Sequence, residues 1–223
     1  MPHDAEKRKV AENGILQKIK ASMKGRLTDE EVKSMTMAAV LTKANIKEAI
    51  MRVKGHTAPG RDGIPIEPYQ ACARVSDEIL EHLKELYEHI LQKGEMPDNM
   101  KEAVTTMVYK GEPKPRNQPT NYRPVTVTAT EYRILATCLA QKLAENIHKI
   151  IGDSQIGFQI RRDIGENIDL MEEVLRYTNG EASERGGAIA ILDNAHAFDY
   201  VAWPFMFDAL DAFGLWLLSS VPT

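Results

Sequence analysis

Helical periodicity recurs in five segments of this chain and favours a largely helical fold. Apolar residues recur on one helical face in residues 42–53, 76–93, 131–151, 165–177 and 203–214. Two kinds of segment break the pattern: a pair of short apolar runs at 103–109 and 123–128, and a single run at 188–192. Short apolar runs next to turn residues are typical of strands. We therefore expect an α+β fold dominated by helices.

Polar and glycine residues mark where the helices begin and end. Thr42 can cap the first helix, which must stop by Gly55. Gly94 follows the second helix at a position that favours a left-handed residue, and Gly152 ends the third. The run from Ala58 to Pro65, with its prolines and glycines, excludes regular structure and predicts a tight, ordered turn.

Composition excludes several classes of protein. The 223 residues are 43% hydrophobic and 27% charged, enough for one sizeable core or two small ones. The formal net charge of -4 argues against nucleic-acid binding by bulk attraction, so any such role must rest on local basic patches. Cys72 and Cys138 fit reduced thiols, and the histidines show no zinc-ligand spacing.

No apolar stretch approaches the roughly 18 residues that a membrane span requires, and the N-terminus lacks a signal core. A mitochondrial transit peptide is the alternative for the basic N-terminal segment, but Asp4, Glu6 and Glu12 interrupt it. We therefore expect an intracellular protein, nuclear or cytoplasmic, without a membrane partner.

The pair of runs at 103–109 and 123–128 predicts a hairpin with a basic loop. Cationic residues in and around it outnumber acidic ones: Lys101, Lys110, Lys114, Arg116, Arg123 and Arg133 against Glu102, Glu112 and Glu131. Such a loop can bind phosphates, lysine as a point charge and arginine as a bidentate fork. The alternative is an ordinary solvated hairpin tip.

The run from Ala188 to Leu192 predicts a strand buried on both faces, which ends at Asp193. A carboxylate at the end of a buried strand lies where ligands commonly bind and where a hard cation such as magnesium can be held. An aspartate after a strand also commonly serves as a turn or helix-cap residue. Spacing alone leaves both interpretations open.

Read together, the segments resemble a known family. The motifs that carry the resemblance are Lys54 with Ala58-Pro59-Gly60-Arg61-Asp62-Gly63-Ile64-Pro65, Gly94-Glu95-Met96-Pro97, Tyr109-Lys110-Gly111-Glu112-Pro113-Lys114, Asn121-Tyr122-Arg123-Pro124-Val125, Gln155-Ile156-Gly157-Phe158 with Arg162, Asn167-Ile168, Leu192-Asp193, Ala197-Phe198-Asp199 and Val201-Ala202-Trp203. In this order, over roughly 42–214, they resemble the reverse transcriptase domain of LINE-type (non-LTR) retrotransposons, from the fingers into the first part of the palm.

The resemblance implies a right-hand polymerase, an RNA-directed DNA polymerase that uses two-metal nucleotidyl transfer. Its partners would be an RNA template, a DNA primer and deoxynucleoside triphosphates, with Mg²⁺ as cofactor. By resemblance, Asp193 is the first metal-binding and catalytic aspartate, and Phe198 lies under the nucleotide sugar, although a core phenylalanine is the alternative. The remaining implied site residues contact the triphosphate (Lys110 and Arg123) or the template (Gln155, Gly157, Phe158 and Arg162).

The same resemblance divides the chain into a polar N-terminal arm at 1–41, fingers at 42–185, the start of a palm at 186–214 and a divergent or truncated tail at 215–223. His196 and Arg161 stand where the family usually has lysine and glycine. No two aspartates adjoin anywhere in the sequence, so the family's paired-aspartate palm motif is missing. We expect a fragment of a transposable element that is inactive alone.

Two other hypotheses stay open. The chain could be a noncatalytic nucleic-acid-binding or interaction module derived from a reverse transcriptase. It could also be a mostly helical scaffold with accidental motifs, although the order of the motifs argues against that.

Overall fold

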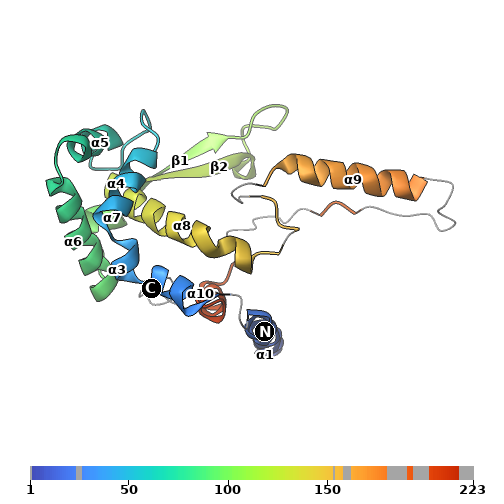
Figure 1. Ribbon diagram of the computed structural model, residues 1–223. Helices are drawn as coiled ribbons and strands as arrows, with labels where there is room; N and C mark the ends of the chain where they lie inside the picture. The colour runs from blue at the N-terminus through green and yellow to red at the C-terminus, as the bar shows by residue number, and fades with distance from the viewer. Residues whose placement is uncertain are drawn as a thin grey trace. The chain divides into compact units, whose positions relative to one another are not determined.

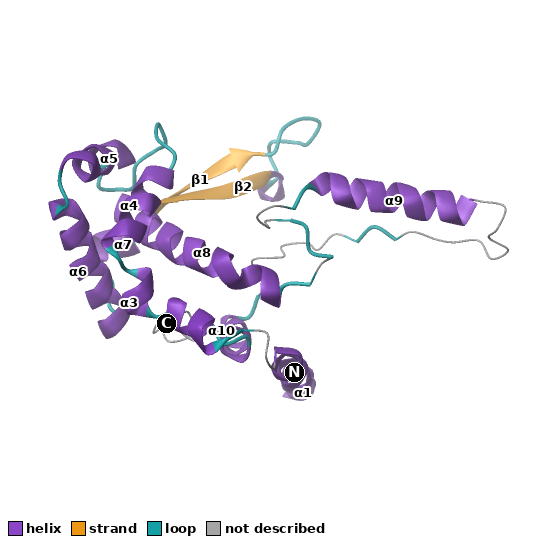
Figure 2. Cartoon of the chain, in the orientation of Figure 1, coloured by secondary structure: helices purple, strands orange, loops and turns teal. Residues whose placement is uncertain are grey.

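The computed structural model describes residues 2–23, 27–152, 154–157, 162–179, 190–192 and 201–215. Its elements in chain order are α1 (Pro2–Met23), α2 (Asp29–Ser34), α3 (Met37–Val40), α4 (Lys43–Arg52), α5 (Ile66–Val75), α6 (Glu78–Lys93), α7 (Asp98–Lys101), β1 (Ala103–Tyr109), the 3-10 helix η1 (Pro119–Asn121), β2 (Tyr122–Thr128), α8 (Thr130–Ile150), α9 (Ile164–Asn179) and α10 (Trp203–Ala212) (Figure 1). Helices dominate, and β1 and β2 form a two-stranded sheet (Figure 2). The prediction of a largely helical α+β fold is confirmed for these residues.

The chain divides into two compact units. We call Met1–Glu31 with Ala144–Ser219 the terminal unit, and Val32–Leu143 with Ser220–Thr223 the central unit. The described helices include none long and apolar enough to cross a membrane.

The core of the central unit forms where α4 packs against α5 and α6 (Figure 1). The fully or almost fully buried side chains of these and neighbouring segments are Val40, Leu41, Ile46, Ala49, Ile50, Ile66, Ala73, Leu80, Leu83, Tyr87, Ile90, Ile134, Leu135 and Cys138. Burying these apolar side chains supplies the main driving force for folding the unit. Most of these residues lie in the helices predicted at 42–53, 76–93 and 131–151, but Val40, Leu41, Ile66 and Ala73 lie outside them. The helix predicted at 165–177 adds nothing to this core, since its apolar side chains are exposed.

The capping residues predicted from the sequence are confirmed. The Thr42 hydroxyl accepts a hydrogen bond from the Asn45 amide at 3.2 Å and so caps α4. The Asn45 side chain in turn donates to the carbonyls of Ala39 and Val40, which fixes the entry into α4. Gly94 ends α6 with a φ of 70°, a left-handed conformation that glycine adopts without steric cost.

The turn from Ala58 to Pro65 packs against the start of α8. Asp62 accepts a hydrogen bond from the Ile64 amide at 2.9 Å, and Gly63 has a φ of 74°. The Thr130 hydroxyl donates to the Ile64 carbonyl at 2.6 Å. The backbone of Gly60 lies so close to Ala129 that a β-carbon would stand 2.7 Å from the Ala129 Cα. The predicted ordered turn is thus held by hydrogen bonds and by close backbone contact.

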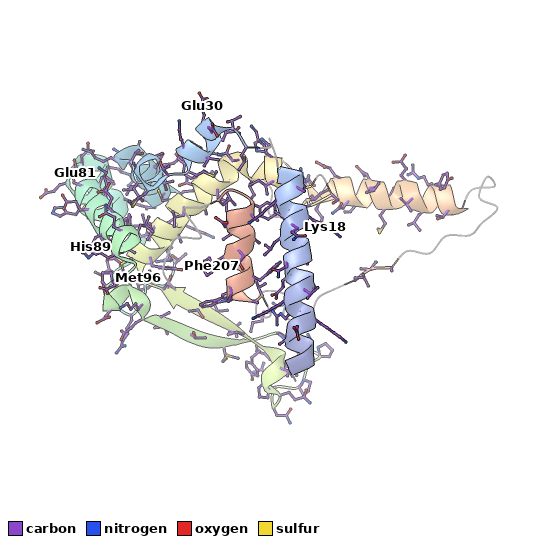
Figure 3. The ribbon with its side chains drawn as sticks, turned by 90° about the horizontal axis from the view of Figure 1, so that it is seen from below. Lys18, Glu30, Glu81, His89, Met96 and Phe207 are labelled. Carbon is purple, nitrogen blue, oxygen red and sulfur yellow. The ribbon has the colours of Figure 1, made fainter. Side chains whose placement is uncertain are left out.

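In the terminal unit, α1 and α10 lie side by side, as Figure 3 shows. A capping box begins α2: the Thr28 amide donates to the Glu31 carboxylate at 2.8 Å, and the Glu31 amide donates back to the Thr28 hydroxyl at 3.3 Å. The same carboxylate also forms an ion pair with Lys149 near the end of α8. These contacts lower the pKa of Glu31 to about 2, chiefly through the hydrogen bond from Lys149.

The predicted strand at 188–192 is wrong over the residues that can be checked. Residues 190–192 have no regular structure, and the side chains of Ile191 and Leu192 are 86% and 90% exposed. A strand buried on both faces needs flanking strands and covering layers. In the described part of the chain the only sheet is β1 with β2, which pair with each other, so no neighbour covers this run.

Candidate nucleic-acid interface

The hairpin formed by β1 and β2 has two distinct faces. Its antiparallel register sets Tyr109 opposite Tyr122 and Val108 opposite Arg123. Since successive side chains of a strand point to opposite faces, Lys110 shares a face with Val108 and therefore with Arg123. We call this the basic face. It continues toward the base of the hairpin with Val104, Thr106, Val125 and Val127.

Lys110 and Arg123 are exposed at the end of the basic face nearest the tip loop. The Lys110 ammonium donates to the Thr120 carbonyl at 2.6 Å, which holds its charge near the loop. An ammonium has three donors, so this bond leaves capacity for a second acceptor. On the same face, Val104, Val108 and Val125 are each 45–47% exposed. The basic face can therefore offer phosphate contacts beside an apolar surface.

The tip loop is supported by its own side chains. Three consecutive carbonyls of the loop accept hydrogen bonds from side chains: that of Lys114 from the Tyr109 hydroxyl, that of Pro115 from the Asn121 side-chain amide, and that of Arg116 from the Tyr122 hydroxyl. The Lys110 amide also donates to the Asn121 carbonyl at 2.9 Å. These bonds order the loop, although its residues from Glu112 to Thr120 are all exposed.

The opposite side of the hairpin, which we call the aromatic face, carries Tyr109, Tyr122 and Met107. The two tyrosine rings lie 5.6 Å apart between centroids, tilted by 52°. The guanidinium carbon of Arg116 lies 4.8 Å from the centroid of the Tyr109 ring, a cation–π contact. The sequence alone does not predict this cluster. The sequence shows a tyrosine at each end of a basic loop. That these two tyrosines lie side by side is known only once the strand register is known.

The base of the hairpin is tied to the 58–65 turn. Arg61 pairs with Glu102, just before β1, at 2.6 Å. At the end of β2, the Thr128 carbonyl lies 3.0 Å from where a Gly60 β-carbon would stand. The turn therefore contacts both ends of the hairpin's base and helps to fix how the hairpin leaves the central unit.

A polar network lies at the start of α8, next to the same turn. Tyr69 donates to the Glu131 carboxylate, and Tyr87 donates to the Glu131 carbonyl at 2.9 Å. Burial, with the Glu131 carboxylate as a smaller cause, raises the pKa of both tyrosine hydroxyls. Arg133 donates to the hydroxyls of Thr57 and Thr130 at 3.1 and 3.0 Å. Arg133, counted with the basic hairpin in the sequence, instead helps to hold the turn.

The predicted template-binding residues belong to the terminal unit. Arg162 donates to the carbonyls of Gly152 and Gln155 at 2.9 and 2.5 Å, and the Gln155 side-chain amide donates to the Gly157 carbonyl at 3.3 Å. The structure thus brings Gln155, Gly157 and Arg162 together around one turn. Phe158 lies outside the described residues.

Asp193, the predicted catalytic and metal-binding residue, and Phe198, the predicted sugar contact, also lie outside the described residues. Over the ranges that the structure describes, no three His, Cys, Asp or Glu side chains gather in a way that could hold a metal ion. The fit of Mg²⁺ to Asp193 therefore stays a prediction from the sequence.

Two curated proteins resemble this chain. The "Transposon TX1 uncharacterized 149 kDa protein" of Xenopus laevis is 26% identical over 176 residues, which are 78% of this chain and 13% of that protein. The "Retrovirus-related Pol polyprotein from type-1 retrotransposable element R1" of Bradysia coprophila is 26% identical over 179 residues, 77% of this chain and 17% of that protein. The chain is related to non-LTR retrotransposon proteins.

This retrotransposon-related chain spans less than a fifth of the length of either relative. No protein-family profile matches it. The alignments cover more than three quarters of the chain, so the relationship extends well beyond any one of its short motifs. The LINE-type resemblance drawn from the motifs is confirmed at this level.

Proposed function

We propose that this chain is a retrotransposon-derived fragment of a reverse transcriptase, comprising the fingers and the first part of the palm of a right-hand polymerase. Its basic face binds the phosphates of the incoming nucleotide and of a template–primer. The fragment retains binding but does not polymerise by itself. Support comes from its relatives, one of which is named a Pol polyprotein.

The observation that carries the proposal is the placement of Lys110 and Arg123. The hairpin register puts both cations on one face, near the tip of an exposed hairpin. From Tyr109 to Arg123 the segment has four cationic side chains against one carboxylate, in a chain of net charge -4. Two adjacent cations can stabilise the negative charge of a triphosphate, the lysine as a point charge and the arginine as a fork.

The other residues have roles in the proposal that follow from the resemblance. Asp193 would ligate Mg²⁺, which supplies charge stabilisation for phosphoryl transfer when bound. Phe198 would exclude a 2′-hydroxyl beside the nucleotide sugar. The terminal-unit turn of Gln155, Gly157 and Arg162, with Phe158, would lie along the RNA template.

The first test is the salt dependence of binding to an RNA template annealed to a DNA primer. Wild type is expected to bind weakly, with affinity that falls as salt rises, because lysine and arginine displace counterions from phosphates. The double variant Lys110→Glu/Arg123→Glu is expected to bind more weakly and with a flatter slope. Each lost phosphate contact lowers the slope of log affinity against log salt by about 0.7–0.9.

Arg74→Glu/Lys93→Glu is the matched control, since it reverses two exposed cations of α5 and α6 and changes the net charge equally. If both double variants behave alike, only overall charge matters. The proposed phosphate site on the basic face would then be wrong.

A further inference from the structure

We propose that the aromatic face of the hairpin is a second binding surface, which takes the bases of single-stranded nucleic acid. The site consists of Tyr109, Arg116 and Tyr122. It lies on the side of the hairpin opposite the basic face, so the hairpin would contact phosphate on one side and bases on the other. The inference deepens the proposed function, and rests on it in taking the ligand to be nucleic acid.

The register and the ring contacts place the three side chains together. Tyr109 and Tyr122 are directly opposite each other in the ladder, so their side chains leave the same face. Arg116 reaches back from the loop over the Tyr109 ring, 4.8 Å from its centroid. The hairpin thus presents an exposed guanidinium lying over one ring, with a second ring beside it, and both kinds of planar group can stack on a base.

The rings are held in place before any ligand binds. Both tyrosine hydroxyls donate to carbonyls of the tip loop, Tyr109 to Lys114 and Tyr122 to Arg116. Both tyrosines are half-buried, and Arg116 is exposed. A surface that is already ordered loses less conformational freedom on binding than a set of free side chains.

The charges around the aromatic face indicate which kind of ligand it binds. The aromatic face adjoins Lys114 and Arg116, while the loop between the strands carries a single carboxylate, Glu112. Rings beside fixed positive charge match a chain of exposed bases joined by phosphates. In a duplex the bases are stacked and paired, and their faces are covered. A single strand is therefore the form of nucleic acid that fits this face.

The test compares two oligonucleotides of equal length and charge: oligo-dT, and an oligomer whose sugars carry no bases. Their affinities are measured by fluorescence anisotropy at one salt concentration. Stacking contributes at least about fivefold per base, so wild type is expected to prefer oligo-dT by that factor or more. Tyr109→Leu/Tyr122→Leu is expected to bring the preference close to one.

Tyr109→Phe/Tyr122→Phe is the matched control, because it removes the same two hydroxyl bonds but keeps both rings. It should retain the preference. Arg116→Lys keeps the charge without the guanidinium plane and should reduce the preference in part. The stacking site is refuted if wild type binds both oligomers equally, or if the Leu variant keeps as much of the preference as the Phe variant does.

Lys110→Glu/Arg123→Glu separates this inference from the proposed function. Those substitutions act on phosphate, so they should weaken both oligomers alike and leave the ratio unchanged. The preference should also appear with oligo-rU, since the rings contact bases rather than sugars. A preference confined to one sugar would show recognition of the ribose and overturn the inference.

Discussion

Gly60 has no room for a side chain at the point where the 58–65 turn meets α8. A β-carbon there would stand 2.7 Å from the Ala129 Cα, 2.9 Å from the Ala129 nitrogen and 3.0 Å from the Thr128 carbonyl oxygen. These are backbone atoms, which cannot rotate away. Gly60→Ala is therefore expected to lower the free energy of unfolding by about 1–3 kcal/mol, the usual cost of overpacking. Urea denaturation, monitored by circular dichroism, measures this change in the free energy of unfolding.

Gly55→Ala is the control for this substitution. Its β-carbon would contact the Glu67 carboxylate at 3.2 Å, at the movable end of a side chain. We expect a clearly smaller loss of stability. An equal loss in both variants would mean that the close backbone approach at Gly60 does not set the cost.

Glu31 should make the terminal unit sensitive to acid. Its pKa is about 2 in the folded chain, chiefly because Lys149 and the Thr28 amide bind the charged carboxylate. The pKa is lower in the folded state, so the stabilisation is fully present above the ordinary value of 4.5 and is lost as pH falls from there toward 2. Glu31→Gln should therefore flatten the loss of stability with acid across that window.

The measurement is the urea midpoint as a function of pH. Glu30→Gln is the control, because this exposed neighbour in the first turn of α2 makes none of the Glu31 contacts. If the two variants show the same pH profile, Glu31 does not carry the acid sensitivity.

Among the elements, α4 is predicted both by its N-terminal capping residue, Thr42, and by the apolar residues along one of its faces. Thr42→Ala removes the hydrogen bond to the Asn45 amide and should cost about 1 kcal/mol. Thr42→Ser keeps the hydroxyl and should retain most of the stability. Thermal unfolding of the three proteins compares them, and a Ser variant as unstable as the Ala variant would contradict the capping role.

The elements that the sequence predicted are those whose signals are local. A threonine cap, a glycine end and an apolar stripe suffice for α4 and α6. The sequence pattern does not predict α5, whose ten residues include Pro68 near the start. That helix depends on tertiary contacts: Gln70 donates to the carbonyls of Ile50 and Val53 at the end of α4.

The hairpin shows the same limit at the candidate site. Its strands follow from composition, and so does the presence of cations near its loop. The strand register decides which side chains share a face. It places Lys110 and Arg123 on one face and Tyr109 and Tyr122 on the other. A shift of one residue would instead set Arg123 opposite Tyr109 and mix cations with tyrosines on each face. Register could not be derived from the sequence alone, so the aromatic face was missed.

At the scale of the whole molecule, the proposed function predicts that this chain does not polymerise by itself. Two-metal transfer requires ions about 4 Å apart held by several carboxylates, and no adjacent aspartates exist in the chain. Asp208, a candidate replacement, lies on α10, a helix of the terminal unit that packs against α1. The purified chain is therefore expected not to extend a primer with magnesium and deoxynucleotides, even where it binds template–primer.

A chimera that adds the paired-aspartate palm segment of a related element should gain primer extension, and Asp193→Asn in that chimera should abolish it. The matched control is Asp208→Asn, which should leave the chimera active because its side chain is exposed on α10. Gel analysis of extended primers distinguishes these proteins. Extension by the unmodified chain that disappears with Asp193→Asn would instead show a complete site, and the interpretation of this chain as a binding fragment would have to be abandoned.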